Sequence, residues 1–314
     1  MLVLVRRRLL QLVIVLFGLS VITFVLMKLA PGDPVLSILR IDEVAVTQAD
    51  EEAVREKLGF NKPFLLQYGE WLLRVLKLDL GSSYVNGTPV LTLLSSRLPL
   101  TLQLTAGAIV VMLALAIPLG LLAARYPGRW PDHLCRIFAL LGASIPNFLL
   151  GLLLIYFLSY RLGWLPTMGT GGIRHMILPS VTLGFALAAV YSRLLRSGLL
   201  DSLAQPYIRA ARARGIAGWR VVLLHALRPA LLPMLAVFGM SLGSMLAGSV
   251  VVEMLYAWPG IGSLAVDAVF QRDYPVIQGY VLLTGAFVII VNLVVDVCYG
   301  LLDPRISFGK GDLQ

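Results

Sequence analysis

The sequence predicts an all-α membrane protein with six transmembrane helices, and three observations support this prediction. Hydrophobic residues make up 58% of the 314-residue chain and charged residues only 14%, whereas a soluble domain is about half apolar and about a quarter charged. The apolar residues gather in long runs, and a helix needs about 20 such residues to cross the hydrocarbon core. The basic residues fall between these runs, so the net charge of +9 indicates loops beside a membrane and not a nucleic-acid-binding surface.

Six segments are long and apolar enough to span the membrane, namely residues 9–30, 99–124, 134–160, 177–195, 230–251 and 279–302. The first run follows a cluster of arginines and precedes no small-residue cleavage site, which predicts a retained span and not a signal peptide. The loops expected beside the N-terminus are rich in arginine, whereas the opposite short loops carry only Arg161, Arg174 and Arg272. The positive-inside rule therefore predicts that both termini are cytoplasmic.

Residues 31–97 are predicted to form a small helical subdomain on the external side, between the first span (residues 1–30) and a five-helix core (residues 98–314). A capping box from Thr47 to Asp50 starts one short helix, which ends at Gly59. Pro63 suits the first turn of a second helix with an apolar stripe. We expect this insertion to rest on the membrane surface, packed against the spans; contact with a binding partner is the alternative.

Several spans contain residues that affect helix packing. Pro118, Pro146 and Pro179 predict kinks, which neighbouring helices can accommodate in a bundle. The fifth span carries small residues at close spacing, which predict a helix-packing seam formed by Gly239, Gly243 and Gly248. The sequence leaves open whether this seam faces the same chain or a second subunit.

Catalytic and metal-binding equipment is not apparent in the sequence. The chain has no phosphate-binding loop motif, and His133, His175 and His225 occupy separate loops, so we predict no catalytic residue and no metal site. Energy for any transport must then come from an ion gradient or from a separate ATPase. Asp296 is the only acidic residue inside a span, and a proton relay generally needs a chain of such groups.

A basic segment between the fourth and fifth spans is the most informative part of the chain. Pro206 fits a first helical turn, the following Ala and Arg residues favour helix, and Gly215 is a natural stop. The piece is too short and too charged to cross the membrane. It is either a solvated basic loop, or a helix whose small Ala faces fit a groove on another protein with Arg at the rim.

The same segment resembles the coupling motif of binding-protein-dependent ABC importer permeases. Ala210, Ala211 and Gly215 match the family spacing, Arg209 stands where the general motif has Glu, and the stretch from His225 to Pro233 resembles the peptide/nickel branch. Further fragments of that branch occur in order along the chain, at Ala30 to Pro34, Leu78 to Ser83, Gly142 to Phe148, Ile177 to Pro179, Ala257 to Gly262, Arg272 to Gln278 and Leu302 to Arg305.

This resemblance implies a permease subunit with the type I ABC importer fold in a bacterial inner membrane. A coupling helix at about residues 202–218 is then expected to contact an ATPase through Tyr207, Ile208, Arg209, Ala210, Ala211, Arg212 and Gly215. The implied partners are a second homologous permease, two cytoplasmic ATPases, and a periplasmic or lipid-anchored solute-binding protein, all beside membrane lipids. ATP and Mg would bind the ATPases, and this chain is expected to bind no cofactor.

Two further expectations follow from the resemblance. The external loop of Trp258, Pro259 and Gly260 either gates the pathway or meets the binding protein, or it is simply a rigid turn. The stretches from Gly32 to Val85 and from Met168 to Gly172 most resemble permeases for nickel or metal chelates, with dipeptides or oligopeptides as the alternative. A gradient-driven carrier and a non-transporting membrane scaffold are the remaining functional hypotheses.

Overall fold

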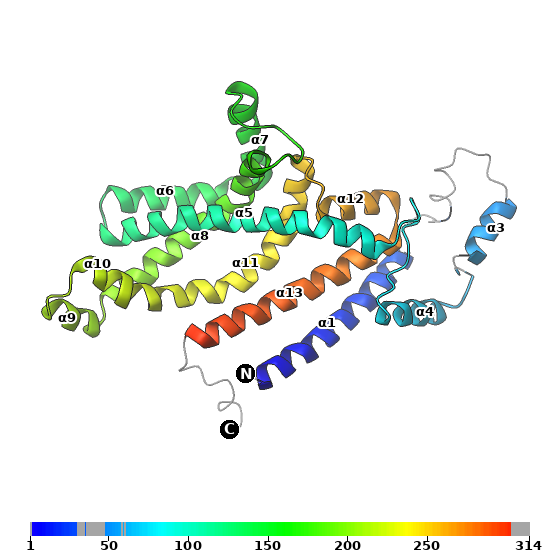
Figure 1. Ribbon diagram of the computed structural model, residues 1–314, viewed down its shortest axis with the longest axis horizontal. Coiled ribbons are helices and arrows are strands. Elements are labelled where there is room, and N and C mark those ends of the chain that lie inside the picture. Colours follow the sequence, from blue (N-terminus) through cyan, green and yellow to red (C-terminus); the bar gives the residue numbers. More distant parts are fainter. Residues whose placement is uncertain (1, 30–34, 36–47, 58, 60, 303–314) are drawn as a thin grey trace. The chain divides into compact units, whose positions relative to one another are not determined.

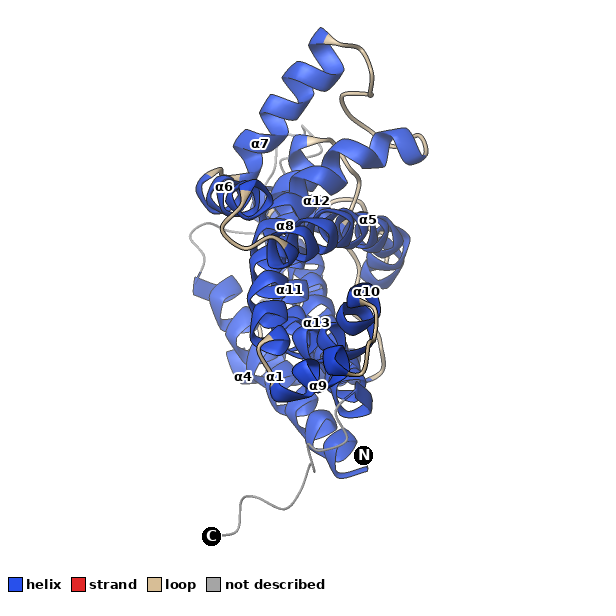
Figure 2. Cartoon of the chain, turned by 90° about the vertical axis from the view of Figure 1, so that its left-hand side faces the viewer, coloured by secondary structure: helices blue, strands red, loops and turns tan. Residues whose placement is uncertain are grey.

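The computed structural model describes the chain except for residues 1, 30–34, 36–47, 58, 60 and 303–314. Thr47 lies outside the described residues, so the structure describes only part of the predicted capping box. The described part is helical and contains no strand apart from one isolated bridge between Ser82 and Pro89 (Figures 1 and 2). Its elements are α1 (Leu2–Leu29), α3 (Gln48–Lys57), α4 (Phe64–Leu76), α5 (Val90–Arg125), α6 (Trp130–Ser144), α7 (Asn147–Leu154), η2 (Ile155–Arg161), α8 (Ile173–Leu203), α9 (Pro206–Ala213), α10 (Gly218–Arg220), η3 (Val221–Ala226), α11 (Leu227–Leu255), α12 (Ile261–Gln271) and α13 (Tyr274–Leu302).

The all-α membrane class is confirmed. Five described helices are long and apolar enough to cross a membrane: Arg8–Leu29, Val90–Arg125, Ile173–Leu203, Gly218–Leu255 and Tyr274–Cys298. A sixth span results if the bent pair of α6 with α7 and η2 is counted as one. The observed helices extend past the predicted spans, because a helix continues into the polar loops until a cap or proline ends it.

The third predicted span, residues 134–160, is not one continuous helix. α6 and the α7–η2 pair are bent by 105° at a short break. Ile145 is extended, with ψ of 118°, and Pro146 follows with φ of −60° and ψ of 140°. Proline lacks the N–H of a helical bond and disfavours helix in the residue before it. The expected kink at Pro146 is therefore a full break.

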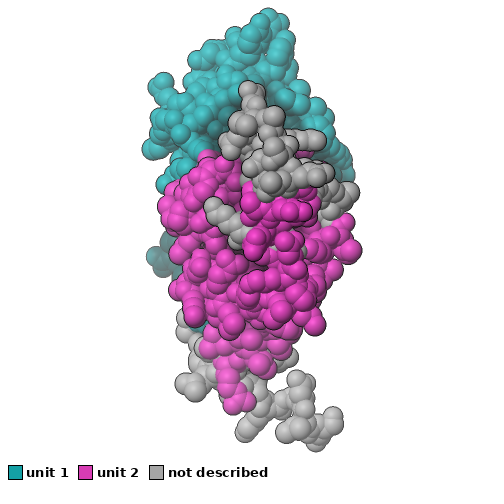
Figure 3. All heavy atoms as spheres, turned by 90° about the vertical axis from the view of Figure 1, so that its right-hand side faces the viewer, with its two compact units in different colours: residues 1–5, 100–259, 290–314 teal, residues 6–99, 260–289 magenta. Residues whose placement is uncertain are grey.

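The chain divides into two compact units, coloured in Figure 3. Unit 1 comprises residues 1–5, 100–259 and 290–314, and unit 2 comprises residues 6–99 and 260–289. This division differs from the predicted boundaries at residues 30 and 97, because α12 and the first part of α13 group with the external segment. The functional division into spans and insertion stays a prediction.

Helix α8 is the packing centre of unit 1, where it lies against α6, α7 and α11. Small residues allow these approaches. A Cβ at Gly184 of α8 would lie 2.5 Å from the Ala108 carbonyl oxygen of α5, and one at Gly120 of α5 would lie 2.9 Å from Leu195. Such distances exclude any side chain, so glycine is required for the helices to touch.

The predicted packing seam on α11 shows such a close helix approach at only part of its length. A Cβ at Gly239 would lie 2.5 Å from Oδ1 of Asn292 in α13, which is a tight approach. At Gly248 the nearest atom, in Leu183, is an ordinary 3.5 Å away. Gly243 lies on the same helix, half-buried. The seam was expected along the whole run of small residues on α11, but the close approach on α11 is at Gly239, and further close approaches occur at glycines of α5, α6, α7, α8 and α13.

Unit 2 joins α4 to the C-terminal part of α1 through an aromatic cluster. The ring of Phe24 lies 5.3 Å from both Phe64 and Tyr68 and 5.7 Å from Trp71, measured between centroids. The hydroxyls of Ser20 and Tyr68 are 2.9 Å apart in a hydrogen bond. The second helix predicted in residues 31–97 is confirmed as α4, with Pro63 at its N-cap and not in its first turn.

Candidate functional site

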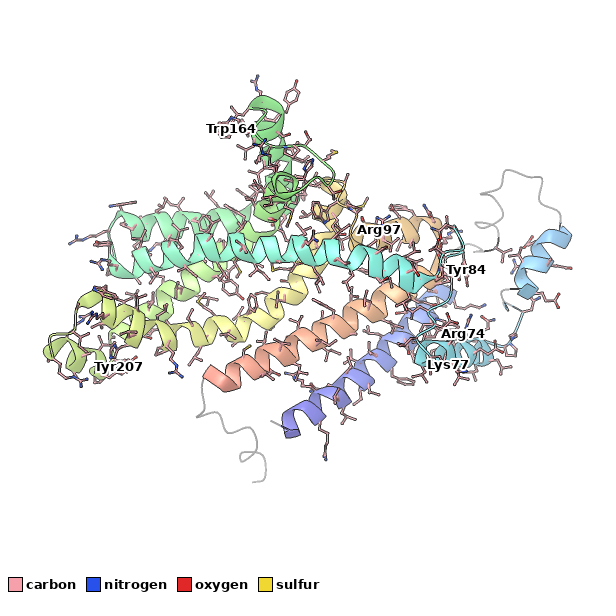
Figure 4. The ribbon with its side chains drawn as sticks, in the orientation of Figure 1. Arg74, Lys77, Tyr84, Arg97, Trp164 and Tyr207 are labelled. Carbon is pink, nitrogen blue, oxygen red and sulfur yellow. The ribbon has the colours of Figure 1, made fainter. Side chains whose placement is uncertain are left out.

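The predicted coupling helix at about residues 202–218 is shorter than expected, because Ser202 and Leu203 still belong to α8 and Gly218 begins α10. Its central part is α9, an eight-residue helix joined to the end of α8 by Ala204 and Gln205 (Figure 4, Tyr207). Gln205 is the N-cap and Pro206 is the first helical residue. Proline is favoured at this position because its ring presets φ and its missing N–H would have no partner inside the helix. The start of the helix is therefore determined locally, as the sequence predicts.

Gly215 ends α9 in a left-handed conformation with φ of +77°. Its N–H donates to the Arg212 carbonyl at 2.9 Å, and the Ile216 N–H donates to the Ala211 carbonyl at 3.3 Å. This pair of bonds is the Schellman arrangement, in which glycine is preferred because a Cβ disfavours positive φ. No other atom lies within 4 Å of the Cβ position, so a larger residue would be strained by its own backbone and not by crowding.

The two faces of α9 differ sharply. Ile208 and Ala211, three residues apart and thus on one face, are fully buried and belong to the same hydrophobic cluster as Leu195 of α8 and Val221 of η3. Helix α9 contacts η3, which in turn contacts α8. The remaining predicted contact residues are exposed, namely Tyr207, Arg209, Ala210, Arg212 and Gly215. The expectation that both alanines fit a partner's groove is wrong for Ala211, because that methyl group fills this chain's own core.

A buried ion pair between Asp132 and Arg196 holds the C-terminal part of α8, which leads into α9. The carboxylate of Asp132, in the first turn of α6, is fully buried and accepts bonds from Arg196 Nε at 2.5 Å and Nη2 at 2.9 Å. It also accepts the Gly128 N–H at 2.9 Å and Arg136 Nη2 at 3.1 Å. Arg196 lies 64 residues away on α8. The bidentate pair thus joins the α5–α6 turn to the helix that leads into α9.

Asp132 is not among the functional residues predicted from the sequence. A local signal existed, since an acid in the first turn of a helix with Arg four residues later is a favourable pattern. That pattern identifies Arg136, whose side chain is mostly exposed, and not Arg196, which provides the two shorter bonds.

The turn of Trp258, Pro259 and Gly260 is built as a rigid element. The Trp258 indole is buried, and its Nε1–H donates to the Leu100 carbonyl at 3.0 Å. Beside it, the buried Tyr256 hydroxyl lies 2.8 Å from the Thr182 hydroxyl, and it donates to the Gly151 carbonyl at 3.3 Å. Pro259 is half-buried, and Gly260 caps α12. This geometry fits the rigid-turn interpretation and leaves the indole unavailable for surface contact.

Two of the sequence fragments meet in unit 2. Asp273, at the α12–α13 corner, is buried, and its carboxylate accepts a short hydrogen bond from the Ser83 hydroxyl and the Tyr84 N–H at 3.0 Å. Ser83 and Asp273 are 190 residues apart. Burial raises the pKa of Tyr84 to about 12, with Asp273 adding to the rise and Arg74 opposing it. The loop after α4 is therefore held to the corner by a carboxylate.

The comparisons with known proteins identify the family. Residues 116–308 match the binding-protein-dependent transport system inner membrane component, and residues 1–105 match the N-terminal part of such a membrane component. The chain belongs to the binding-protein-dependent ABC importer permeases. The resemblance recognised in the sequence, to the peptide/nickel family of these permeases, is thereby confirmed.

Relatives and solved structures agree with this assignment. The chain is 42% identical over 313 residues to the oligopeptide transport system permease protein AppB of Bacillus subtilis (strain 168), covering 96% of this chain and 98% of the relative. It is 42% identical over 307 residues to the glutathione transport system permease protein GsiC of Escherichia coli (strain K12), covering 97% and 98%. An inward-facing methionine ABC transporter, MetNI, matches with a TM-score of 0.55 at 20% identity, over 68% of this chain and 97% of that chain.

The permease is thus a multi-pass membrane subunit of an ABC importer with the type I fold. Its family implies ATPases on separate subunits, a partner permease and a binding protein. The relatives are named for oligopeptides and glutathione, so they favour the peptide alternative over the nickel interpretation made from the sequence.

Proposed function

We propose that this permease forms half of the membrane pathway of an importer for small peptides, driven by ATP on partner subunits. The observation that carries the proposal is identity of 42% to oligopeptide and glutathione permeases over nearly the full length of each chain. Glutathione is itself a small peptide, so both names point to one substrate class. The second half of the pathway comes from a homologous permease, and a periplasmic or lipid-anchored binding protein delivers the solute.

In this proposal α9 is the contact with an ATPase. Its exposed face presents Tyr207 and three arginines (Arg209, Arg212 and Arg214) around the small Ala210. Tyrosine and arginine are the residues that most often dominate protein interfaces, and a small residue between them lets the helix approach closely. The shape of this face therefore suits a groove on a soluble partner.

Motion of α9 reaches the spans through its buried face. Ile208 and Ala211 share one buried cluster with residues of η3 and α8, η3 contacts both α9 and α8, and the Asp132–Arg196 pair joins α8 to the α5–α6 turn. A close-packed interior transmits displacement with little compression. ATP and Mg²⁺ on the ATPases favour one arrangement of α9 over another, and only such differential binding can shift the pathway between its states.

The remaining parts follow from the predicted topology. The N- and C-termini face the cytoplasm of a bacterial cell, as α9 does, and the insertion formed by α3 and α4 faces outward. The turn of Trp258, Pro259 and Gly260 shapes the outer mouth through its backbone, since the indole is packed inside unit 1.

The test is uptake by the complete transporter reconstituted in vesicles with ATP inside. We expect ATP-dependent accumulation of labelled dipeptides or oligopeptides that excess nickel does not inhibit and that an uncoupler does not abolish. Uptake of nickel or a nickel chelate with no uptake of peptides would overturn the substrate class. Uptake by the permease without ATPases, abolished by an uncoupler, would overturn the ATP-driven mechanism and restore the gradient-driven hypothesis.

A further inference from the structure

Helix α4 carries an apolar surface that the other described residues of the chain do not cover. Four leucines of this 13-residue helix are largely exposed: Leu65 (79%), Leu66 (56%), Leu73 (61%) and Leu76 (73%). At 3.6 residues per turn these four positions fall on one arc of the helix, with Gly69 between them. We call this surface the leucine arc. An exposed apolar patch of this kind is typical of an interaction site.

The other two sides of α4 have different roles. The side next to the leucine arc packs against α1 through Phe64, Tyr68 and Trp71, which surround Phe24. The remaining side is polar and exposed, with Glu70, Arg74 and Lys77. Glu70 accepts two bonds from Lys62, at 2.6 and 2.8 Å, so the cations exceed the acids on this side. The helix therefore has one side packed against α1, one exposed apolar side (the leucine arc) and one basic side.

The place of α4 on α1 indicates what covers the leucine arc. From Arg6 onward α1 belongs to the same unit; it is long and apolar enough to cross the membrane, and the described residues leave most of its surface uncovered. Its exposed Ile22, Leu26 and Leu29 lie at the same end as Phe24, the residue on which α4 rests. The leucine arc thus continues an apolar surface that faces lipid.

Charge and aromatic content point to the membrane interface in particular. Tyr68 and Trp71 lie at the junction of the two helices, and these residue types are enriched where hydrocarbon meets headgroups. Arg74 and Lys77 are exposed on the basic side of α4 (Figure 4). A helix with Leu on one face and Lys or Arg on another lies in the interface plane, with its cations at the lipid phosphates.

We propose that α4 is an interfacial membrane anchor. Its leucine arc enters the boundary of headgroups and acyl chains in the leaflet at the C-terminal end of α1, while Arg74 and Lys77 contact lipid phosphates. The anchor sets the depth of the loop that follows, in which Ser83 and Tyr84 bind Asp273 at the α12–α13 corner. Lipid thereby positions the segment between α4 and α5.

The test uses the complete transporter in vesicles of phosphatidylcholine and phosphatidylglycerol. Cys135 and Cys298, the two native thiols, are replaced by Ala. Single cysteines then carry an environment-sensitive fluorophore at Leu65→Cys and Leu73→Cys in the leucine arc. Glu70→Cys, on the same helix but on its polar side, is the matched control. Each site is quenched separately by aqueous iodide and by lipids brominated at shallow acyl positions.

We expect blue-shifted emission, strong quenching by brominated lipid and little quenching by iodide at positions 65 and 73, with the reverse at position 70. Iodide quenching at 65 and 73 as strong as at 70 would show that the arc faces water and overturn the proposal. Protection of 65 and 73 from both quenchers would also overturn it, because a protein partner would then cover the arc. The measurement reports position and not uptake, so its outcome is independent of the transported substrate.

Discussion

Helices α9 and α4 are built on one plan and differ in their exposed sides. Each is a short helix attached by a buried face, α9 through Ile208 and Ala211, and α4 through Tyr68 and Trp71. The free side of α9 presents arginines around a small residue, whereas that of α4 presents four leucines beside a basic strip. The attached side indicates what each helix moves or holds. The free side is the one that we propose contacts the partner, a protein groove in one case and lipid in the other.

The largest expected effect separates the two faces of α9. Ala211→Asp places a carboxylate among the apolar side chains of a fully buried cluster, which costs about 3–5 kcal/mol. Ala210→Asp changes only the exposed face. We expect the first variant to lose folded protein from the membrane. The second should keep normal amounts but lower ATP-driven uptake.

We compare Ala211→Asp with Ala210→Asp by measuring their abundance in the membrane, the thermal unfolding of the purified complex, and uptake. Wild-type stability of Ala211→Asp would contradict the buried attachment of α9. Normal uptake by Ala210→Asp would contradict its role as the ATPase contact.

An intermediate effect tests the brace between α8 and the α5–α6 turn. Asp132→Asn keeps the shape of the side chain but removes the charge that Arg196 binds, and we expect a loss of about 2 kcal/mol in stability. The matched control is Arg136→Gln, since that side chain is mostly exposed and contributes one longer bond, at 3.1 Å. Its effect should stay within about 0.5 kcal/mol.

Thermal unfolding in one detergent compares the two variants directly. The ratio of peptide taken up to ATP hydrolysed adds a readout beyond stability, because a brace that transmits motion should lower this ratio in Asp132→Asn. Equal unfolding temperatures for the two variants would rule out the brace.

The smallest effect concerns the end of α9. Gly215→Val forces a β-branched residue into positive φ, at a cost of about 1–2 kcal/mol confined to the last turn. Gly218→Ala is the control, because that glycine has no positive φ and no atom within 4 Å of its Cβ position.

We expect Gly215→Val to remain folded and to hydrolyse more ATP per peptide, while Gly218→Ala behaves like the wild type. Hydrolysis and uptake measured together in vesicles check this. The same ratio for both variants would show that the Schellman turn does not hold the contact face.

Most of the fold could be predicted from the sequence because its signals are local. Apolar runs identify helices α1, α5, α8, α11 and α13, since burying the backbone in lipid leaves helix as the only choice for such runs. The ends of α9 were predicted for the same reason, because Pro206 and Gly215 act on their own φ angles. The break after α6 was underestimated, since a proline marks a kink but its angle depends on the helices packed around it.

The site was predictable in its position and less so in its detail. The coupling motif located α9. Its spacing placed both Ala210 and Ala211 on one functional surface, but in the structure Ala210 is exposed and Ala211 is buried in the core of the chain. The proposed substrate class rests on the names of similar permeases, because the motifs that suggested nickel are shared by nearly all members of the peptide/nickel family.

The sequence by itself determined the membrane class, most of the spans, the start of α9 at Pro206 with its stop at Gly215, and the family, since each depends on composition, local dihedral preference or motif order. Only the tertiary structure decided which face of α9 is buried, that Arg196 and not Arg136 provides the shorter bonds to Asp132, and that Asp273 holds Ser83. These contacts join residues 64 and 190 positions apart. No local preference specifies such partners, because they depend on how whole helices pack and on which charges that packing removes from water.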